Sequence, residues 1–370
     1  MHILFAGGGT AGHINPALAI AGHIREKHPE SHISYIGTPD KLESKLVPEK
    51  GYNFRTISVV GFQRKLTIEN IFKNISAVSK AVTASNRARK ILKELQPDVV
   101  IGTGGYVSGP VLREAAKLGI KTAIHEQNAF PGVTTKMLAP NVDAVMLAMP
   151  EAEKYLKLNK KPFITGNPVR QELLNITREE ARAKMGLKDN DVMVLSFGGS
   201  LGAMKINQAV AGFIKTHNKT GEIYHIHGTG KSGYDDFKNL LNDTKLSNKI
   251  DVREYINDMD VCMAAADLII GRAGAITLSE LLACGKPSIL IPSPYVAENH
   301  QFHNAMTLKK IGAAEIIEEK DLTAEKLTEV VFDLLNDKQK LSQMATAARE
   351  GAIIDSNERI YEIIMQLYEK

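Results

Sequence analysis

Short apolar runs alternate with longer stretches of helical periodicity along the first 165 residues. Between residues 16 and 27, for example, Ala17, Ile20, Ala21 and Ile24 recur at a spacing that places them on one helical face. Such alternation of strand and helix predicts a parallel sheet with helices on both faces. The predicted strands are Ile3–Ala6, Ile33–Ile36, Val99–Ile101, Thr122–Ile124 and Ala144–Leu147.

The same alternation begins again in the second half of the chain. Between the two series, residues 162–169 are rich in Pro and Gly, as hinges are. We therefore predict an α/β protein with two doubly wound, Rossmann-like parallel-sheet domains, residues 1–165 and 166–354, that face a deep cleft. The second set of strands is Val192–Phe197, Ile223–Ile226, Val252–Tyr255, Leu268–Ile270 and Ser288–Ile291.

The C-terminal region reads as helices. We predict one over Ala324–Leu335 with Thr323 as its N-cap, and another over Ser356–Tyr368 with Ser356 as its N-cap. We expect the last segment, residues 355–370, to cross back and join the first domain.

Composition and charge narrow the protein class. The chain has 370 residues, of which 44% are hydrophobic, and its net charge of +4 is too small to indicate a nucleic-acid binder. Two cysteines, Cys262 and Cys284, suggest neither a disulfide scaffold nor a zinc site, and favour a reducing compartment. The N-terminus runs into glycines too soon for a signal peptide, and no apolar run approaches the ~20 residues of a membrane span. We expect a protein at the cytoplasmic face of a membrane, held peripherally.

Basic residues crowd one stretch of the first half. A basic face beside apolar side chains suits an anionic membrane surface, and residues 68–82 are a candidate docking face. A solvated helix face, or for residues 68–82 an ordinary buried helix, fits the pattern equally well. The basic residues are Arg55, Arg64, Lys65, Lys73, Lys80, Arg87, Arg89, Lys90 and Lys93.

Four glycine-rich turns each follow a predicted strand: residues 7–13, 102–110, 198–203 and 271–275. Glycine lets backbone N–H groups approach an anion, and a following helix N-terminus adds partial positive charge. One such turn can be glycine-rich for geometry alone, but four favour binding of several phosphate groups. None is a P-loop, because no Gly-Lys-Ser/Thr follows at the spacing of that motif. Asp40, after the second strand, leaves a nicotinamide site open as a weak alternative.

Polar side chains at the ends of strands in the first domain are candidates for catalysis. His13 follows the first glycine turn and could accept a proton from a substrate hydroxyl, or merely bind phosphate. Residues 125–128 read His-Glu-Gln-Asn at a strand end, where Glu126 is a second candidate base and Asn128 could bind a sugar. The alternative is that these side chains only hold their loop in place.

The second domain and the hinge offer candidates for binding a nucleotide sugar. Arg170 at the hinge could neutralise a diphosphate, and Glu280 could take both hydroxyls of a ribose. Gln301 follows a proline-stiffened loop, and Ile256 could present its backbone to a uracil edge. Asp258-Met259-Asp260 opens a predicted helix, where Asp acts as a cap, so we predict no metal site and no cofactor.

Taken in order, these motifs resemble the MurG family within glycosyltransferase family 28, and the resemblance covers essentially the whole chain. The family adds N-acetylglucosamine to undecaprenyl-pyrophosphoryl-N-acetylmuramoyl-pentapeptide. The motifs that carry the resemblance are residues 8–13 (GGTAGH), 104–110 (GGYVSGP), 125–128 (HEQN), 166–170 (GNPVR), 198–203 (GGSLGA), 272–275 (RAGA) and 299–301 (NHQ).

The resemblance implies a GT-B fold and an inverting transfer from UDP-N-acetylglucosamine to the C4 hydroxyl of lipid I, which forms lipid II. It implies an acceptor and membrane-docking role for residues 1–165 and a donor-binding role for residues 166–354. His13 would be the base and Glu280 would hold the ribose. The implied substrate-binding residues are Thr10, Ala11, Gly12, Asn128, Arg170, Ser200, Ile256, Ala275, Ile276, Thr277, Leu278, Ser279, Glu280 and Gln301.

Two positions depart from the family pattern, and other functions stay open. Ala11 stands where the family often has glycine, and Leu201 where glutamine is frequent, which puts a side-chain contact there in doubt. A glycolipid synthase or a UDP-N-acetylglucosamine 2-epimerase of the same fold is the alternative enzyme; an epimerase needs no acceptor. A UDP-sugar-binding regulator is the non-enzyme alternative. The partners expected are UDP-N-acetylglucosamine, lipid I, the anionic membrane and cell-wall synthesis proteins, but no nucleic acid.

Overall fold

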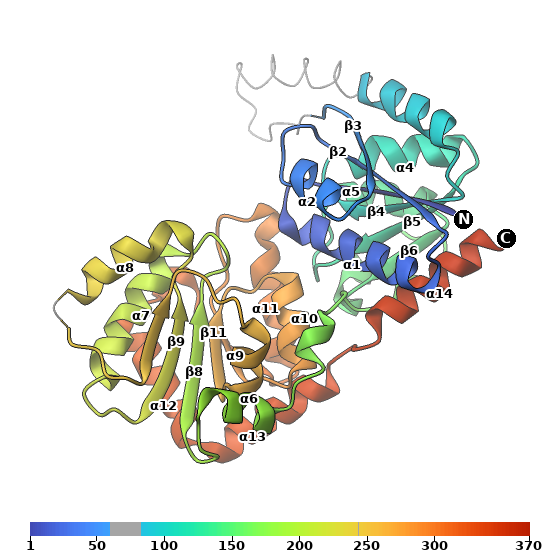
Figure 1. Cartoon of the computed structure of the whole chain (residues 1–370). Coiled ribbons are helices and arrows are strands. Elements are labelled where there is room, and N and C mark those ends of the chain that lie inside the picture. The colour runs from blue at the N-terminus through green and yellow to red at the C-terminus, as the bar shows by residue number, and fades with distance from the viewer. Residues whose placement is uncertain (60–82, 243) are drawn as a thin grey trace. The chain divides into compact units, whose positions relative to one another are not determined.

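The computed structural model describes residues 1–59, 83–242 and 244–370, which form two units (Figure 1). Unit 1 comprises Met1–Pro168 and Asp355–Lys370, and unit 2 comprises Val169–Ile354. The chain thus changes unit after Pro168, three residues beyond the predicted boundary, and its last segment returns to unit 1. Candidate docking residues 68–82 lie outside the described ranges. None of the helices described has the length and apolarity needed to cross a bilayer.

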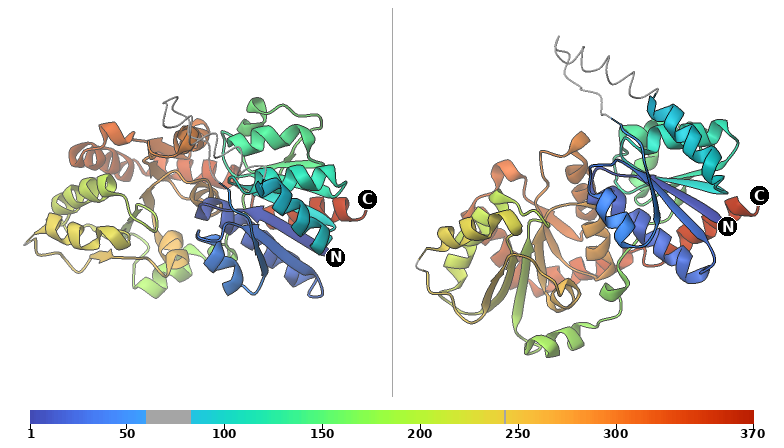
Figure 2. Two further views of the ribbon diagram at one scale, coloured as in Figure 1. Left: turned by 90° about the horizontal axis from the view of Figure 1, so that it is seen from above. Right: turned by 45° about the horizontal axis from the view of Figure 1, so that its top comes forward.

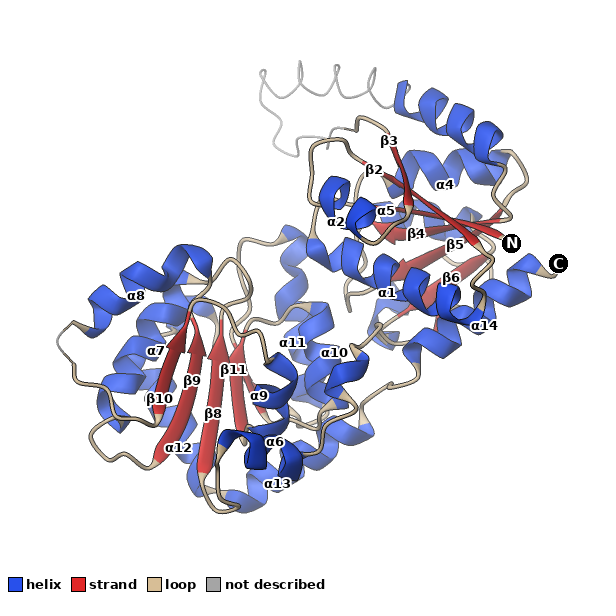
Figure 3. Cartoon of the chain, viewed as in Figure 1, coloured by secondary structure: helices blue, strands red, loops and turns tan. Residues whose placement is uncertain are grey.

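Unit 1 is built on a parallel sheet of seven strands in the order β3-β2-β1-β4-β5-β6-β7 (Figure 3). Its central strands are buried along almost their whole length, as expected where helices cover both faces. The strands are β1 His2–Gly7, β2 His32–Gly37, β3 Asn53–Thr56, β4 Val99–Gly104, β5 Lys121–Glu126, β6 Ala144–Leu147 and β7 Phe163–Ile164.

Helices cover the two faces of this sheet. On one face, α1 and α14 pack against the sheet through residues such as Ile20, Ile24 and Ile360. On the other face lie helical residues 83–95 together with α4 and α5, which bury Ile91, Val111 and their neighbours. The helices are α1 Ala11–Lys27, α2 Glu43–Glu49, α4 Ser108–Lys117, α5 Val133–Leu138 and α14 Ser356–Tyr368, with short 3-10 turns at Ala139–Asn141 and Pro150–Tyr155.

The contact between α1 and α14 fixes the C-terminal segment on unit 1 (Figure 2). Glu358 pairs with His23 at 3.1 Å and with Lys27 at 2.5 Å, and Tyr361 OH lies 2.7 Å from His28 Nε2. The predicted N-cap of this helix was wrong by one residue: Asp355 occupies the N-cap, and Ser356 is the first helical residue.

Unit 2 repeats the plan with six parallel strands in the order β10-β9-β8-β11-β12-β13. One hydrophobic core packs α7, α8, α12 and α13 against a face of the sheet. The strands are β8 Val192–Phe197, β9 Ile223–Gly228, β10 Ile250–Arg253, β11 Leu268–Gly271, β12 Ser288–Leu290 and β13 Ala314–Ile316. The helices are α6 Arg178–Met185, α7 Met204–His217, α8 Tyr234–Leu241, α9 Met259–Ala265, α10 Ala275–Ala283, α11 His300–Lys310, α12 Ala324–Asn336 and α13 Lys338–Glu350, with 3-10 turns at Gln171–Leu173, Lys231–Gly233, Ala297–Asn299 and Glu319–Asp321.

Two helix starts in unit 2 test the predicted caps. Thr323 caps α12 as predicted, since its hydroxyl accepts from the N–H of Lys326 at 3.1 Å. Asp258 occupies the N-cap position of α9, as predicted, but its carboxylate makes no cap bond and instead pairs with Arg253 at 2.6 Å. The arginine gives that carboxylate a charge-assisted bond.

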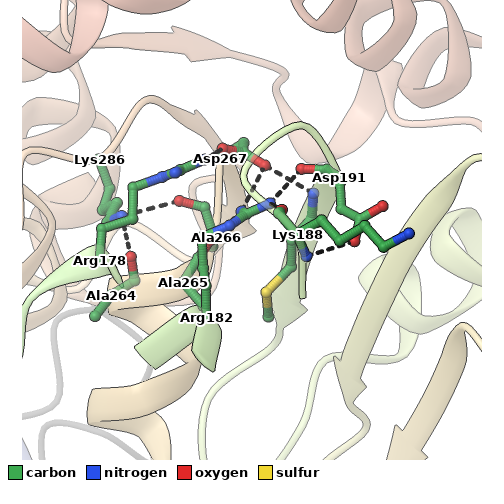
Figure 4. A network of polar contacts seen from close by, with 10 residues as sticks. Arg178, Arg182, Lys188, Asp191, Ala264, Ala265, Ala266, Asp267 and Lys286 are labelled. Atoms are coloured by element: carbon green, nitrogen blue, oxygen red, sulfur yellow. Dashed lines mark hydrogen bonds and ion pairs between the residues drawn. The ribbon is translucent and has the colours of Figure 1, made fainter. Parts of the chain in front are cut away.

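A buried polar network ties α6 to the amino end of β11 (Figure 4). The guanidinium of Arg182, 1% exposed, donates to the carbonyls of Lys188 at 2.6 Å, Asp191 at 2.5 Å and Ala265 at 3.0 Å. Lys286 donates to two further carbonyls nearby, and burial lowers its pKa to about 8. Asp267, which pairs with Arg178 at 2.6 Å and with Arg182 at 3.4 Å, directly precedes β11. The network therefore lies at the edge of the sheet opposite the glycine turns, where it stabilises the fold rather than forming a site.

A second polar chain crosses the core of unit 2. His217 Nε2 lies 3.0 Å from His225 Nδ1, and Ser196 Oγ bridges His225 and His227 at 2.8 and 2.7 Å. Burial lowers the pKa of His217 to about 4 and of His227 to about 3, and holds that of His225 well below its usual value. All three imidazoles are therefore neutral at physiological pH.

This chain makes unit 2 sensitive to acid. The unfolded histidines bind protons below about pH 6.5 while the folded ones do not, so stability is present above that pH and is lost as pH falls toward 4. We expect the free energy of unfolding to drop by about 2 kcal/mol or more between pH 7 and 5. Urea unfolding at each pH measures the drop. His217→Gln should reduce the drop, whereas the control His32→Gln, at an exposed position, should leave it unchanged. An equal drop in His217→Gln and the wild type would contradict this account.

Candidate functional site

The first two glycine turns of unit 1 lie against each other at the carboxyl edge of the sheet. β1 and β4 are neighbours and pair Gly7 with Gly104. A Cβ on Gly105 would lie 2.4 Å from the Gly8 carbonyl oxygen, and Gly105 has a φ of +79°. No residue with a side chain fits there, so the turns of residues 7–13 and 102–110 form one surface.

Ser108 fixes the second turn from within. Its hydroxyl, fully buried, accepts from the N–H of Gly104 at 3.1 Å and lies 2.7 and 2.8 Å from the carbonyls of Ala6 and Gly104. The sequence motif contained Ser108 without indicating this role. Tyr106, 57% exposed, stands on the outer side of the same turn.

His13 lies in the first turn of α1, which begins at Ala11, five residues before the predicted start. Its Nδ1 is 3.0 Å from the Gly8 carbonyl and 3.3 Å from Thr10 Oγ1. Since a carbonyl can only accept, the bond to Gly8 places the proton on Nδ1 and leaves Nε2 with its lone pair. Thr10, Ala11 and Gly12 are exposed beside it. The arrangement suits a base that faces solvent.

Glu126, the second candidate base, is surrounded by hydrogen-bond donors. Its buried carboxylate accepts from the backbone N–H of Asn128 and the side chain of Asn128, at 3.1 and 3.0 Å, and from Gly132 N and Thr135 Oγ1, at 3.0 and 2.5 Å. Four donors occupy the oxygens that a base would need free. These bonds hold the loop of residues 126–135, and with it the position of Asn128, while a catalytic role for Glu126 stays a prediction.

The neighbours of Glu126 also serve the loop. His125 Nε2 lies 2.9 Å from the Gly166 carbonyl, and Gln127 donates to the His125 carbonyl at 3.0 Å. Burial lowers the pKa of His125, so this imidazole is neutral. Of the four polar residues 125–128, Asn128 alone is only partly buried, and it keeps its candidacy for binding a sugar.

In unit 2, the third glycine turn packs against a turn that sequence analysis missed. A Cβ on Gly202 would lie 2.2 Å from the Thr229 carbonyl, so residues 198–203 and 228–233 approach closely. Residues 228–233 read Gly-Thr-Gly-Lys-Ser-Gly after β9, which is a glycine pattern that could have identified this turn. Ser200 and Leu201 are exposed at the tip of the third turn, residues 198–203, and the side chain of Leu201 is turned to solvent.

The fourth turn leads into α10, where two predicted residues meet. Arg170 Nε donates to Glu280 Oε1 at 2.7 Å, with the arginine side chain 51% exposed and that of Glu280 10% exposed. Ala275 begins α10, and Ile276, Thr277 and Ser279 are partly buried along it. Leu278 is fully buried and its N–H bonds to Gly274, so its side chain cannot touch a ligand and it contributes only to the position of the helix.

The two remaining candidates lie at the carboxyl ends of other strands in unit 2. Gln301 Oε1 accepts from Ser293 N at 2.9 Å, which leaves its amide group to donate. Ile256 is 4% exposed and packs on Gly228, so only its backbone could meet a ligand. Among the residues that the structure describes, no cluster of three or more His, Cys, Asp or Glu side chains is arranged to hold a metal ion.

Comparison with known proteins finds two matching family models and several similar enzymes. The N-terminal domain of glycosyltransferase family 28 matches residues 3–147, and its C-terminal domain matches residues 193–365. The UDP-N-acetylglucosamine--N-acetylmuramyl-(pentapeptide) pyrophosphoryl-undecaprenol N-acetylglucosamine transferase of Acetivibrio thermocellus is 49% identical over 99% of this chain and 98% of its own length. The enzyme of that name from Clostridioides difficile is 44% identical over 100% of this chain and 89% of its own.

Solved structures give the same picture. Acinetobacter baumannii MurG superposes with a TM-score of 0.81 at 29% identity, over 99% of both chains. A UDP-GlcNAc 2-epimerase from Neisseria meningitidis, at 12% identity and a TM-score of 0.64 over 99% of this chain and 100% of its own, shares the fold alone.

The part that Glu126 plays in holding this loop is testable. We expect Glu126→Gln to lower the free energy of unfolding by about 2 kcal/mol, because an amide group cannot accept from all four donors. Urea unfolding measures this, with Glu153→Gln, at an exposed position, as the control. Full stability combined with lost turnover in Glu126→Gln would restore Glu126 as a catalytic residue.

Proposed function

The chain belongs to glycosyltransferase family 28, and from this premise we infer that it transfers N-acetylglucosamine from UDP-N-acetylglucosamine to the C4 hydroxyl of N-acetylmuramoyl-pentapeptide on undecaprenyl pyrophosphate. The observation that carries this inference is 49% identity over 99% of the chain to a transferase of that name. The reaction converts lipid I to lipid II for peptidoglycan synthesis. The fold is GT-B, as the sequence motifs predicted.

In unit 2, the exposed turns and α10 support the donor-binding role. Glu280 would accept hydrogen bonds from both ribose hydroxyls, and Arg170, now its partner at 2.7 Å, would neutralise the diphosphate. The amino end of α10, at Ala275, adds partial positive charge for the same diphosphate. Within this unit, Ser200, Gln301 and the backbone of Ile256 would complete the contacts with the donor.

In unit 1, His13 is our candidate for the base, and residues 1–165 would bind the acceptor. Its Nε2 would take the proton of the C4 hydroxyl as that oxygen attacks the anomeric carbon from the side opposite UDP. The bond from the anomeric carbon to the diphosphate oxygen breaks, and UDP leaves with the electron pair. Thr10, Ala11 and Gly12, exposed beside His13, would contact the reacting sugars.

Peripheral contact with an anionic membrane would bring unit 1 to its lipid-linked substrate. This proposal is supported by helical residues 83–95, which bury Ala84, Ala88 and Ile91 and expose basic residues toward solvent. The exposed basic residues are Arg87, Arg89, Lys90 and Lys93.

Labelled UDP-N-acetylglucosamine and a lipid I analogue test the proposed reaction. We expect labelled disaccharide-lipid, and its absence would overturn the proposal.

His13→Ala should lower kcat by about 10²-fold or more with little change in the donor KM. Glu280→Gln should raise the donor KM roughly tenfold or more, since it loses an ionic acceptor for the ribose. The exposed Glu329→Gln is the matched control and should change neither.

The membrane proposal is tested separately by sedimentation with vesicles. We expect the protein to bind vesicles that contain anionic lipid. Removing a charge from the exposed basic row, Arg87, Arg89, Lys90 and Lys93, should cost about 1 kcal/mol of binding free energy per charge. Arg89→Gln with Lys93→Gln is the test variant, and Lys320→Gln with Lys326→Gln, in unit 2, is its control. Equal binding of the two double variants would rule out this basic row as the docking surface.

A further inference from the structure

A buried carboxylate lies directly beneath the first glycine turn, at a residue that sequence analysis did not single out. Glu43, the first residue of α2, is 0% exposed. Its side chain runs between two glycines: a Cβ on Gly8 would lie 2.2 Å from Glu43 Oε1, and a Cβ on Gly37 would lie 2.5 Å from its Cγ. The two glycines therefore make room for one acidic side chain.

Three hydrogen bonds hold this carboxylate. Oε1 accepts from the backbone N–H and the hydroxyl of Thr38, at 3.1 and 2.8 Å, and Oε2 accepts from Gly9 N–H at 3.1 Å. Burial would raise the pKa of Glu43, but these bonds outweigh burial and the pKa is lowered. The group is therefore a carboxylate at neutral pH.

The bond to Gly9 has a consequence on the other side of the same peptide group. The N–H of Gly9 and the C=O of Gly8 belong to one planar, trans peptide unit and point in opposite directions. The N–H meets Glu43, and the C=O accepts from His13 Nδ1 at 3.0 Å. One peptide group thus connects a buried negative charge to the candidate base, and bonds in such a chain polarise and strengthen one another.

We propose that Glu43 is a positioning residue for His13 that acts through the peptide bond between Gly8 and Gly9. The carboxylate fixes the orientation of this peptide, the Gly8 carbonyl keeps the proton on Nδ1, and Nε2 is left free to accept the substrate proton. When Nε2 takes that proton, the imidazole becomes imidazolium, which the polarised carbonyl and the carboxylate behind it stabilise. No proton moves to Glu43. This inference rests on the proposed function only for the identity of the substrate.

Gly104 keeps the other ring nitrogen accessible. A Cβ at this position would lie 2.9 Å from His13 Nε2 and 2.6 Å from Cδ2, and Gly104 has a φ of +106°. Any side chain would displace the imidazole or cover Nε2. Gly104 thus keeps Nε2 of His13 accessible, while Glu43 acts through the peptide between Gly8 and Gly9 on Nδ1, at the opposite edge of the same ring.

Few other titratable side chains bear on this ring. Of those described around the two turns, Tyr35 from β2 lies beneath Gly7, and Tyr106 stands exposed in the second turn. Burial raises the pKa of Tyr35, with a further contribution from Glu43, so its phenol is uncharged. Among these three groups, Glu43 brings the charge.

Nuclear magnetic resonance of the full chain with ¹⁵N-labelled histidine tests the arrangement without substrate, with the His13 signal assigned by its loss in His13→Ala. We expect the Nδ1–H form in the wild type, and a gain of the Nε2–H form in Glu43→Gln, because the Gly8 carbonyl is then no longer fixed by a carboxylate on the other side of its peptide group. Thr38→Val is the matched control: it removes one hydrogen bond from the same carboxylate but keeps its bond to Gly9, so the Nδ1–H form should persist. An Nε2–H form in the wild type, or the same tautomer populations in the wild type and Glu43→Gln, overturns the proposal.

Turnover provides a second, independent test. Glu43→Gln should lower kcat about tenfold and leave the donor KM unchanged. In the His13→Ala background the same substitution should cost nothing further, since Glu43 acts through His13. An equal loss in both backgrounds would show that Glu43 only supports the fold. If Glu43→Gln does not fold, Glu43→Asp serves in the same cycle with the same criterion.

The two tests also separate this inference from the proposed function. The resonance experiment needs no sugar or lipid, so it decides the role of Glu43 even if the wild type transfers no N-acetylglucosamine. Conversely, a wild type that transfers the sugar while His13 carries its proton on Nε2 would keep the function and reject the positioning role.

Discussion

The close approach of two strand-to-helix turns in unit 1 is the constraint on which its candidate site depends. Gly105 lies against the Gly8 carbonyl and Gly104 against the ring of His13, at distances that leave no room for a Cβ. Because β1 and β4 are neighbours, their ends must share this space, and only glycine lets both turns occupy it. The turns then hold His13 at the edge of the sheet with one ring nitrogen bonded and the other free.

Unit 2 meets a comparable constraint with different partners. Its turns at residues 198–203 and 228–233 touch through Gly202 and the Thr229 carbonyl, and they leave Ser200 exposed. The amino edge of the same sheet is held by the buried network of Arg182, Asp267 and Lys286. Stabilising groups at one edge and exposed turns at the other match the general rule that open α/β sheets bind ligands at the carboxyl ends of their strands.

Buried carboxylates near the turns of unit 1 accept several hydrogen bonds each. Glu126 accepts from donors within residues 128–135, whereas Glu43 accepts from Thr38 and from Gly9 of the first glycine turn. A carboxylate whose lone pairs are filled in this way has little capacity left to accept a substrate proton. His13 keeps one ring nitrogen unbonded, and it remains our candidate for the base.

The sequence by itself determined the two sheets and the family, because buried strands of a parallel sheet appear as continuous apolar runs and the glycine motifs recur in a set order. It did not indicate β3, β7 or β13, which all lie at sheet edges and are only partly buried, so they lack such runs. Tertiary structure alone decided which polar residues are free to react. In the sequence, Glu126 and Glu43 cannot be told from exposed acidic residues. Only the folded structure shows which donors fill their oxygens: residues 128–135 fold back onto Glu126, and Gly9, which is 34 residues away in the chain, reaches Glu43.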